Sequence, residues 1–132
     1  MKSLADALLW IWQLPQNLIG LVMSLIFHVH GSGSCVMNDG SLRRFHYWPY
    51  TSAVSLGCYR FVNRNAGMNT AYHEYGHSMQ SMYLGPLYLL VIGIPSAVWC
   101  IVHSNVSYVY FRWSYYAFYT EFWADDLGGV KR

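Results

Sequence analysis

The sequence predicts a mainly α-helical membrane protein, with three to four helices and a short β hairpin in one domain of 132 residues. Charged residues make up only 11% of the chain, against about 25% in ordinary soluble domains. Hydrophobic residues reach 55% and aromatic residues 18%. Two apolar stretches approach the roughly 20 residues that a bilayer core requires. This composition indicates either a bilayer-embedded chain or an apolar surface that a partner covers.

The first predicted element is an apolar helix over residues 4–27. A signal peptide would have a strongly basic start, a shorter apolar core and a small-residue cleavage site, which this stretch lacks. Four polar residues recur at helical spacing and form one stripe along it: Asp6, Gln13, Asn17 and Ser24. The stripe faces a bundle interior, or lipid headgroups if the helix lies flat. We predict a spanning helix kinked at Pro15, with the in-plane arrangement left open.

The next predicted element is a β hairpin region over residues 35–62. The step from Asn38 through Asp39 to Gly40 is a hairpin-turn signal between two short runs that can pair. Residues 52–62 mix β-branched, aromatic and small residues, as in a strand that a glycine interrupts.

A helix is predicted over residues 70–83, after a polar connection in which Asn69 or Thr70 can serve as the N-cap. The pair Gly85-Pro86 is a helix-terminating signal and should end it.

A helical hairpin is predicted over residues 84–126. Residues 84–103 form the strongest transmembrane candidate, because only His103 in them can carry a charge. Residues 107–126 are rich in aromatic residues and are predicted to return as a second helix. At 1.5 Å per residue the chain would leave by about 30 Å and come back by about 26 Å, which brings the end of the hairpin near its start.

Both glutamates of the chain lie in motifs that suit a metal site. Residues 73–77 read HEYGH, the HExxH pattern, and residues 121–125 read EFWAD, an ExxAD pattern. His73 and His77 are four residues apart, so their imidazoles project from one helical face and can ligate one zinc ion. A catalytic zinc needs a third protein ligand and a position open to water. Glu121 can supply that ligand, and Glu74, about 100° around the helix, is placed to act as the general base.

Asp125 is the predicted outer partner of this site. It follows Glu121 by four residues and therefore lies on the same helical face. From there its carboxylate can accept the free N–H of a ligating histidine and fix the direction of that ring. The alternative interpretation is two helices with an incidental histidine pair and solvated carboxylates.

HEYGH followed by EFWAD resembles the gluzincin metallopeptidases, specifically the membrane group that contains the CaaX prenyl endopeptidases and the heat-shock membrane proteases. In size the chain is similar to the minimal minigluzincins. The resemblance covers about residues 70–126 and implies that His73, His77 and Glu121 bind Zn²⁺ and that Glu74 is the general base. The chain is far shorter than those enzymes and lacks the usual residues around ExxAD, so the resemblance does not identify a substrate.

We therefore expect residues 1–132 to form one membrane-embedded, metallopeptidase-like domain. The expected function is that of an integral membrane zinc metalloendopeptidase with a peptide or membrane-protein substrate and the lipid bilayer as partner. The arginines within residues 43–64 and the basic tail predict a zinc site on the cytoplasmic side. Two alternatives stay open: a zinc-stabilised membrane interaction protein without turnover, and a zinc hydrolase of a lipid-linked amide or ester. The net charge of +2, without a Lys/Arg run, excludes nucleic acid.

Overall fold

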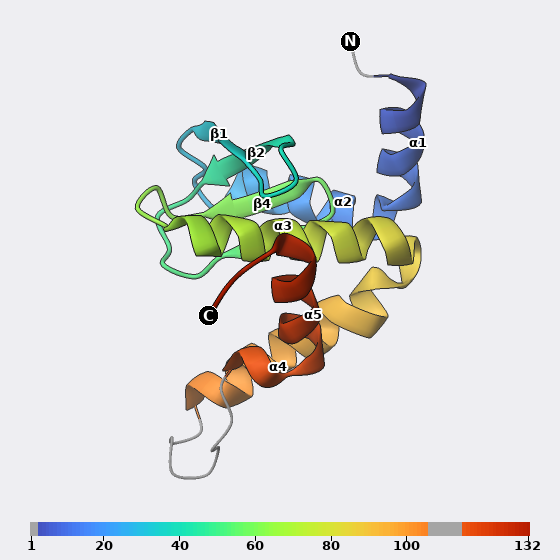
Figure 1. The fold of residues 1–132 in the computed structure, drawn as a ribbon. Coiled ribbons are helices and arrows are strands. Elements are labelled where there is room, and N and C mark those ends of the chain that lie inside the picture. Colours follow the sequence, from blue (N-terminus) through green and yellow to red (C-terminus); the bar gives the residue numbers. More distant parts are fainter. Residues whose placement is uncertain (1–2, 106–114) are drawn as a thin grey trace.

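The computed structural model describes residues 3–105 and 115–132 (Figure 1). In chain order its elements are α1 (Leu4–Trp12), α2 (Leu14–Ile26), β1 (Ser32–Val36), β2 (Leu42–Tyr47), β3 (Val54–Leu56), β4 (Tyr59–Val62), α3 (Met68–Leu84), the 3₁₀ turn η1 (Gly85–Leu87), the π-helical turn η2 (Leu89–Gly93), α4 (Ile94–Asn105), the 3₁₀ turn η3 (Tyr115–Ala117) and α5 (Tyr119–Gly128).

The strands form one mixed sheet in the order β1-β2-β4-β3. β1 and β2 are antiparallel, β2 and β4 are parallel, and β3 and β4 are antiparallel. Figure 1 shows α3 crossing one face of the sheet while α2 lies behind it. The core between the sheet and α3 is formed by Met37, Phe45, Val62 and Tyr75. This layer holds α3 in a fixed position, and α5 then packs on α3.

The predicted turn at residues 38–40 is confirmed, because it joins β1 to β2 with Gly40 at a φ of +81°. The single strand predicted over residues 52–62 is wrong. That segment is a second hairpin, in which Gly57 and Cys58 connect β3 to β4. Gly57 has a φ of +64°, and glycine at the first position of a two-residue loop is the residue that a type II′ turn requires.

The predicted fold class, a mainly α membrane protein of three to four helices with one short hairpin, is wrong. The described part of the chain contains five α-helices and a four-stranded mixed sheet. The physical reason is the parallel pairing of β2 with β4, through which His46 lies opposite Phe61. That pairing merges two separate hairpins into one sheet, and the alternation of residues along each strand gives no signal for it.

Within residues 3–105 and 115–132, no single helix is both long and apolar enough to cross a membrane. The span predicted over residues 4–27 is two helices bent by 91°, and only the bent pair taken together reaches that length and apolar character. The span predicted over residues 84–103 is interrupted by η1 and η2 before α4 begins. The helix predicted over residues 107–126 starts in a part of the chain, residues 106–114, that lies outside the described residues.

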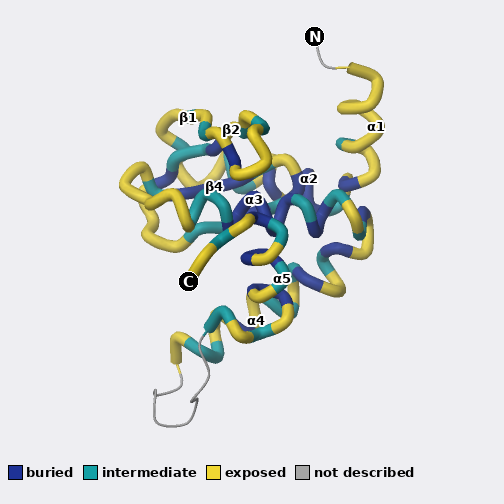
Figure 2. Tube along the Cα trace, in the orientation of Figure 1, coloured by how far each residue is buried: buried dark blue, intermediate teal, exposed yellow. Residues whose placement is uncertain are grey.

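α2 has its polar side buried and its apolar side exposed (Figure 2). The Gln16 side chain donates from Nε2 to the Ser81 hydroxyl and to the Gly85 carbonyl, both at 2.8 Å. Asn17 accepts the Cys58 backbone N–H at 2.8 Å, which ties α2 to the turn between β3 and β4. Seven large apolar residues of α2 are exposed: Leu14, Leu18, Ile19, Leu21, Val22, Leu25 and Ile26. The predicted polar stripe therefore faces the protein interior at Gln13 and Asn17.

The π-helical turn before α4 has a local cause at Pro95. Proline has no N–H to give to the carbonyl four residues earlier, which is that of Val91. The Tyr119 hydroxyl donates to this Val91 carbonyl at 2.6 Å instead. The same contact joins the start of α5 to the segment before α4, so the two helices meet close to Ser96 and Glu121.

Candidate metal centre

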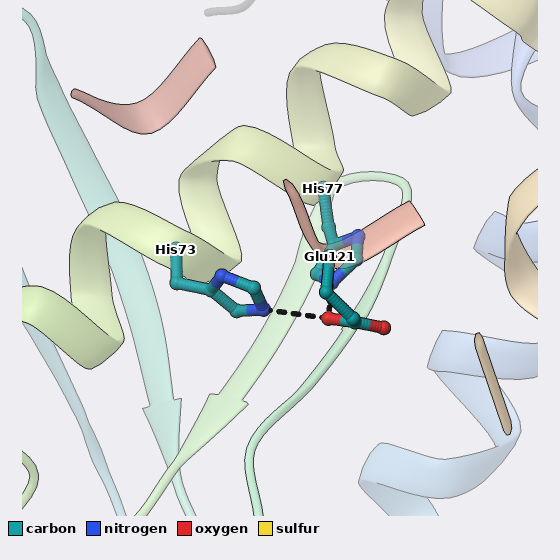
Figure 3. A group of neighbouring side chains, drawn as sticks. All are labelled: His73, His77 and Glu121. Carbon is teal, nitrogen blue, oxygen red and sulfur yellow. Dashed lines mark hydrogen bonds and ion pairs between the residues drawn. The ribbon is translucent and has the colours of Figure 1, made fainter. Parts of the chain in front are cut away.

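Two histidines of α3 and one glutamate of α5 converge on a single point (Figure 3). The Nε2 atoms of His73 and His77 lie 2.9 Å and 3.0 Å from the same oxygen, Oε2 of Glu121. One ligand atom from each residue lies within 4.8 Å of the other two, and all three residues are buried. The spacing of the motifs predicted these three residues, and the structure brings them together.

The donor set and its spacing fit a metal ion. Zinc at about 2.0–2.1 Å from three tetrahedral ligands would separate them by roughly 3.3 Å from one another. The two N···O separations are a few tenths of an ångström shorter than that. A small outward movement of the side chains would therefore open the position that a divalent cation needs. The group His73, His77 and Glu121 can hold a metal ion.

The close approach of α3 and α5 depends on two glycines. A Cβ built on Gly76 would lie 1.8 Å from the carbonyl oxygen of Ala124, and one built on Gly128 would lie 1.9 Å from that of Tyr72. Only glycine therefore allows these backbones to touch, and this contact sets the height of Glu121 above the two imidazoles. Gly76 lies inside the HEYGH motif, but its role could not be inferred without knowing which helix packs on it.

Each imidazole is held from its far side by a second partner. The Nδ1 atom of His73 lies 2.6 Å from Oδ1 of Asp125, as the spacing of ExxAD predicted. Arg132 in turn donates to both carboxylate oxygens of Asp125, at 2.6 Å and 3.0 Å. The Nδ1 atom of His77 lies 2.7 Å from Oε1 of Gln80. Such outer partners fix the tautomer and direction of a ligating ring.

Gln80, Ser96 and Arg132 were missed by the sequence reasoning. Gln80 follows His77 by three residues and so shares its helical face, a signal that was available. Its amide also donates to the Thr120 carbonyl at 2.8 Å, which couples α3 to α5. Ser96 donates its hydroxyl to Oε1 of Glu121, and because it comes from α4 no local pattern could have identified it.

The buried charges of His73 and Glu121 stabilise each other. Burial alone lowers the pKa of His73, but hydrogen bonds to Glu121 and Asp125 and the nearby Glu74 charge raise that pKa to about 9. Burial raises the pKa of Glu121, but hydrogen bonds from both histidines outweigh it and hold this pKa well below its usual range. A cation in this position would replace the imidazole protons that bridge to Glu121.

Glu74 is the remaining predicted site residue, and the structure places it in the interior next to the three ligands. Its side chain is buried, and its Oε2 atom has no hydrogen-bond partner among the described residues. Burial raises the pKa of this carboxyl, although the His77 and His73 charges oppose the rise. An unpartnered buried carboxylate is uncommon in proteins and calls for a functional explanation.

The site is enclosed by protein. Tyr116 lies edge-on to His73, with 5.4 Å between the ring centroids. The three ligands expose at most 7% of their surface, and two cavities of about 520 and 510 Å³ are lined by other residues.

Comparison of the chain with protein-family models, curated proteins and solved structures gives no significant match. The functional argument therefore rests on the geometry and chemistry of the site.

Proposed function

We propose that this chain is a zinc metalloendopeptidase that hydrolyses peptide bonds in a peptide or membrane-protein substrate. One observation carries the proposal: two imidazole nitrogens and one carboxylate converge in a buried site, beside a second carboxylate whose Oε2 atom has no hydrogen-bond partner among the described residues. Zinc accepts nitrogen and oxygen ligands, and its catalytic sites use three protein ligands with the fourth position open to water. His73, His77 and Glu121 supply the three protein ligands of such a site.

Each residue of the site would have a separate role in the hydrolysis. Bound zinc would lower the pKa of water at the site and polarise the scissile carbonyl. Asp125 and Gln80 keep the His73 and His77 rings directed at the ion. Glu74 takes a proton from the attacking water and delivers it to the leaving amine.

The exposed apolar faces of α1 and α2 support a lipid bilayer as partner, with these helices lying on the surface of the bilayer. A surface-bound hydrolase would meet segments of membrane proteins and also lipid-linked amides or esters. A zinc hydrolase of such a lipid-linked substrate is therefore the second candidate. The cytoplasmic placement expected from the sequence rests on a rule for the loops between spanning helices, and it does not extend to a surface-bound chain.

A third candidate, a zinc-stabilised interaction protein without turnover, is favoured by the enclosure of the site. Structural zinc sites are closed, whereas catalytic sites keep one position open to water and substrate. His73, Glu74 and His77 expose only 7%, 4% and 7% of their surface. For the peptidase, a substrate must displace part of what covers these residues. A measurement of turnover is therefore needed to separate the candidates.

The test compares the wild-type chain with Glu74→Gln and His77→Ala, using zinc content and cleavage of a quenched fluorescent peptide library. The peptidase predicts one zinc per chain in the wild type and in Glu74→Gln, with cleavage lost in Glu74→Gln. His77→Ala should lose both zinc and cleavage. Cleavage that survives in Glu74→Gln would refute the mechanism.

Zinc without any cleavage of the library leaves the other two candidates to be separated. Incubation with membrane extract followed by mass spectrometry would reveal products of a lipid-linked amide or ester. Zinc-dependent folding with no product in either assay would support the interaction protein.

A further inference from the structure

A cavity of about 520 Å³ lies against another face of α3 from the metal ligands. Its walls are α1, the strands β2 and β4, and three α3 residues, Tyr75, Ser78 and Met82. At 100° per residue these three lie roughly 140–200° around the helix from His73. Figure 1 shows α1 projecting away from the sheet, and Leu9 and Trp10 of this helix contribute to the cavity wall. Its volume falls within the range of about 300–1,000 Å³ that small-molecule sites occupy.

Arg60 is a buried cation on the wall of this cavity, and within the described part of the chain it forms no ion pair. Only 8% of its surface is exposed. The guanidinium donates to the Arg44 carbonyl at 3.1 Å and to the Ser78 hydroxyl at 3.0 Å, and it stacks over the Phe45 ring. Among the described residues no carboxylate oxygen lies within 4 Å of it. Burial and the Arg43 charge lower the pKa of Arg60 to about 10, which reflects how poorly this cation is compensated.

Arg43 brings a second guanidinium to the same cavity. Its Nε atom is buried and has no hydrogen-bond partner among the described residues. Its Nη2 atom lies 3.4 Å from the Tyr75 hydroxyl, which itself donates to Asp39 at 2.9 Å. His46, also on the wall, has a buried Nδ1 atom with no hydrogen-bond partner in the described part of the chain. The Arg43 charge also acts on the Asp39 carboxylate and helps to lower the pKa of that group. Buried cations and donors are normally paired, so the Arg60 charge and the Nε atom of Arg43 leave a position that an anion would complete.

The other lining residues indicate what kind of molecule the anionic group would belong to. Asp6 is the one carboxylate among the described wall residues, and it accepts the backbone N–H and the hydroxyl of Ser3 at the start of α1. The lining also includes four apolar side chains, two from α1 and one each from β2 and α3: Leu9, Trp10, Leu42 and Met82. The cavity thus combines cationic side chains with apolar side chains, some of which belong to the exposed helix α1.

We propose that this cavity binds an amphiphile with a phosphate or carboxylate head, held between Arg43 and Arg60, and an apolar tail that lies along α1. The ligand is either a free anionic amphiphile or the headgroup of an anionic lipid in a bilayer. The two sources present the same chemistry to the arginines. The site is independent of the proposed hydrolysis, because none of the metal ligands lines the cavity.

The test titrates the wild-type chain with octyl phosphate below its micelle concentration and follows binding by calorimetry. 1-Octanol and inorganic phosphate serve as the tail-only and head-only probes. Arg43→Gln should weaken octyl phosphate binding by about tenfold or more, since it removes a charge-assisted hydrogen bond. Arg64→Gln is the matched control, because Arg64 is exposed and lies outside the cavity. Arg60→Gln is measured as well, with circular dichroism to check that it folds.

Vesicles of phosphatidylglycerol and of phosphatidylcholine distinguish the two sources. Tighter binding to phosphatidylglycerol that Arg43→Gln removes and Arg64→Gln retains would identify a lipid headgroup. Octyl phosphate binding with equal binding to both vesicles would identify a free amphiphile. The proposal is overturned if octyl phosphate binds no tighter than octanol and neither vesicle is preferred. It is also overturned if Arg43→Gln and Arg64→Gln have equal effects.

Discussion

Replacing Gly76 by alanine should separate α5 from α3 and dismantle the metal site. The added Cβ would lie 1.8 Å from the Ala124 carbonyl oxygen, whereas ordinary contacts begin near 3.4 Å. Both atoms belong to helix backbones, so no side-chain rotation can relieve the overlap and the helices must move apart. Metal–ligand distances tolerate only about 0.2 Å. The movement would therefore carry Glu121 out of bonding range of an ion held by the two histidines.

We expect Gly76→Ala to lower the free energy of unfolding by about 1–3 kcal/mol, the usual range for overpacking. Zinc affinity should fall by more than the roughly 10- to 100-fold that follows loss of an outer partner. Chelator competition gives the affinity, and thermal melting followed by circular dichroism gives the stability. Gly67→Ala is the matched control, because Gly67 is the N-cap of the same helix and a Cβ there meets nothing within 4 Å.

Wild-type zinc affinity and melting temperature in Gly76→Ala would refute the close packing of α3 on α5. A loss of stability with zinc affinity unchanged would refute a narrower point, that this packing positions Glu121.

Three further predictions concern Asp125, His73 and Gln16. Asp125→Asn should weaken zinc binding by about 10- to 100-fold. Asp126→Asn is the control and should leave zinc binding unchanged, because Asp126 is exposed. Equal effects of the two variants in chelator competition would contradict the pairing of Asp125 with His73. In chelator-treated protein, the raised pKa of His73 contributes stability that is complete below the unfolded-state pKa of about 6.5 and is lost as the pH rises through about 9. The melting temperature should therefore fall between pH 6.5 and pH 9.5. A melting temperature that stays constant over this range would count against the contribution. Gln16→Leu should lower the free energy of unfolding by about 1–3 kcal/mol, because it leaves buried polar groups unpaired. Leu18→Gln on the exposed side of α2 should change this free energy by less than about 0.5 kcal/mol. Urea unfolding measures both.

The candidate site was predictable from the sequence because its residues recur at short helical spacings. His73 and His77 are one turn apart, and so are Glu121 and Asp125. The contacts that join these pairs are non-local. Ser96 reaches Glu121 from α4, and no periodicity along the chain specifies which helix will pack against another.

The fold was harder to predict for two physical reasons. The apolar stretch of residues 4–27 has the composition of one long helix, but it breaks at Gln13, and Pro15 in the first turn of α2 starts a new helix in another direction. The expected kink at Pro15 was thus close to the break, while the single continuous helix expected over residues 4–27 was wrong. Composition did predict the large apolar surface, because a chain with so few charged residues cannot cover itself with polar groups.

The placement of the ligands on α3 and α5 means that a metal ion would act as a cross-link. His77 and Glu121 are 44 residues apart in the chain, so an ion that joins them closes a long loop containing η1, η2 and α4. In the chain-entropy treatment used for disulfides, a loop of this length corresponds to about 4 kcal/mol. The sheet keeps its own core without that tether. The metal supply would then determine chiefly how stably η1, η2, α4 and α5 are held against α3 and the sheet.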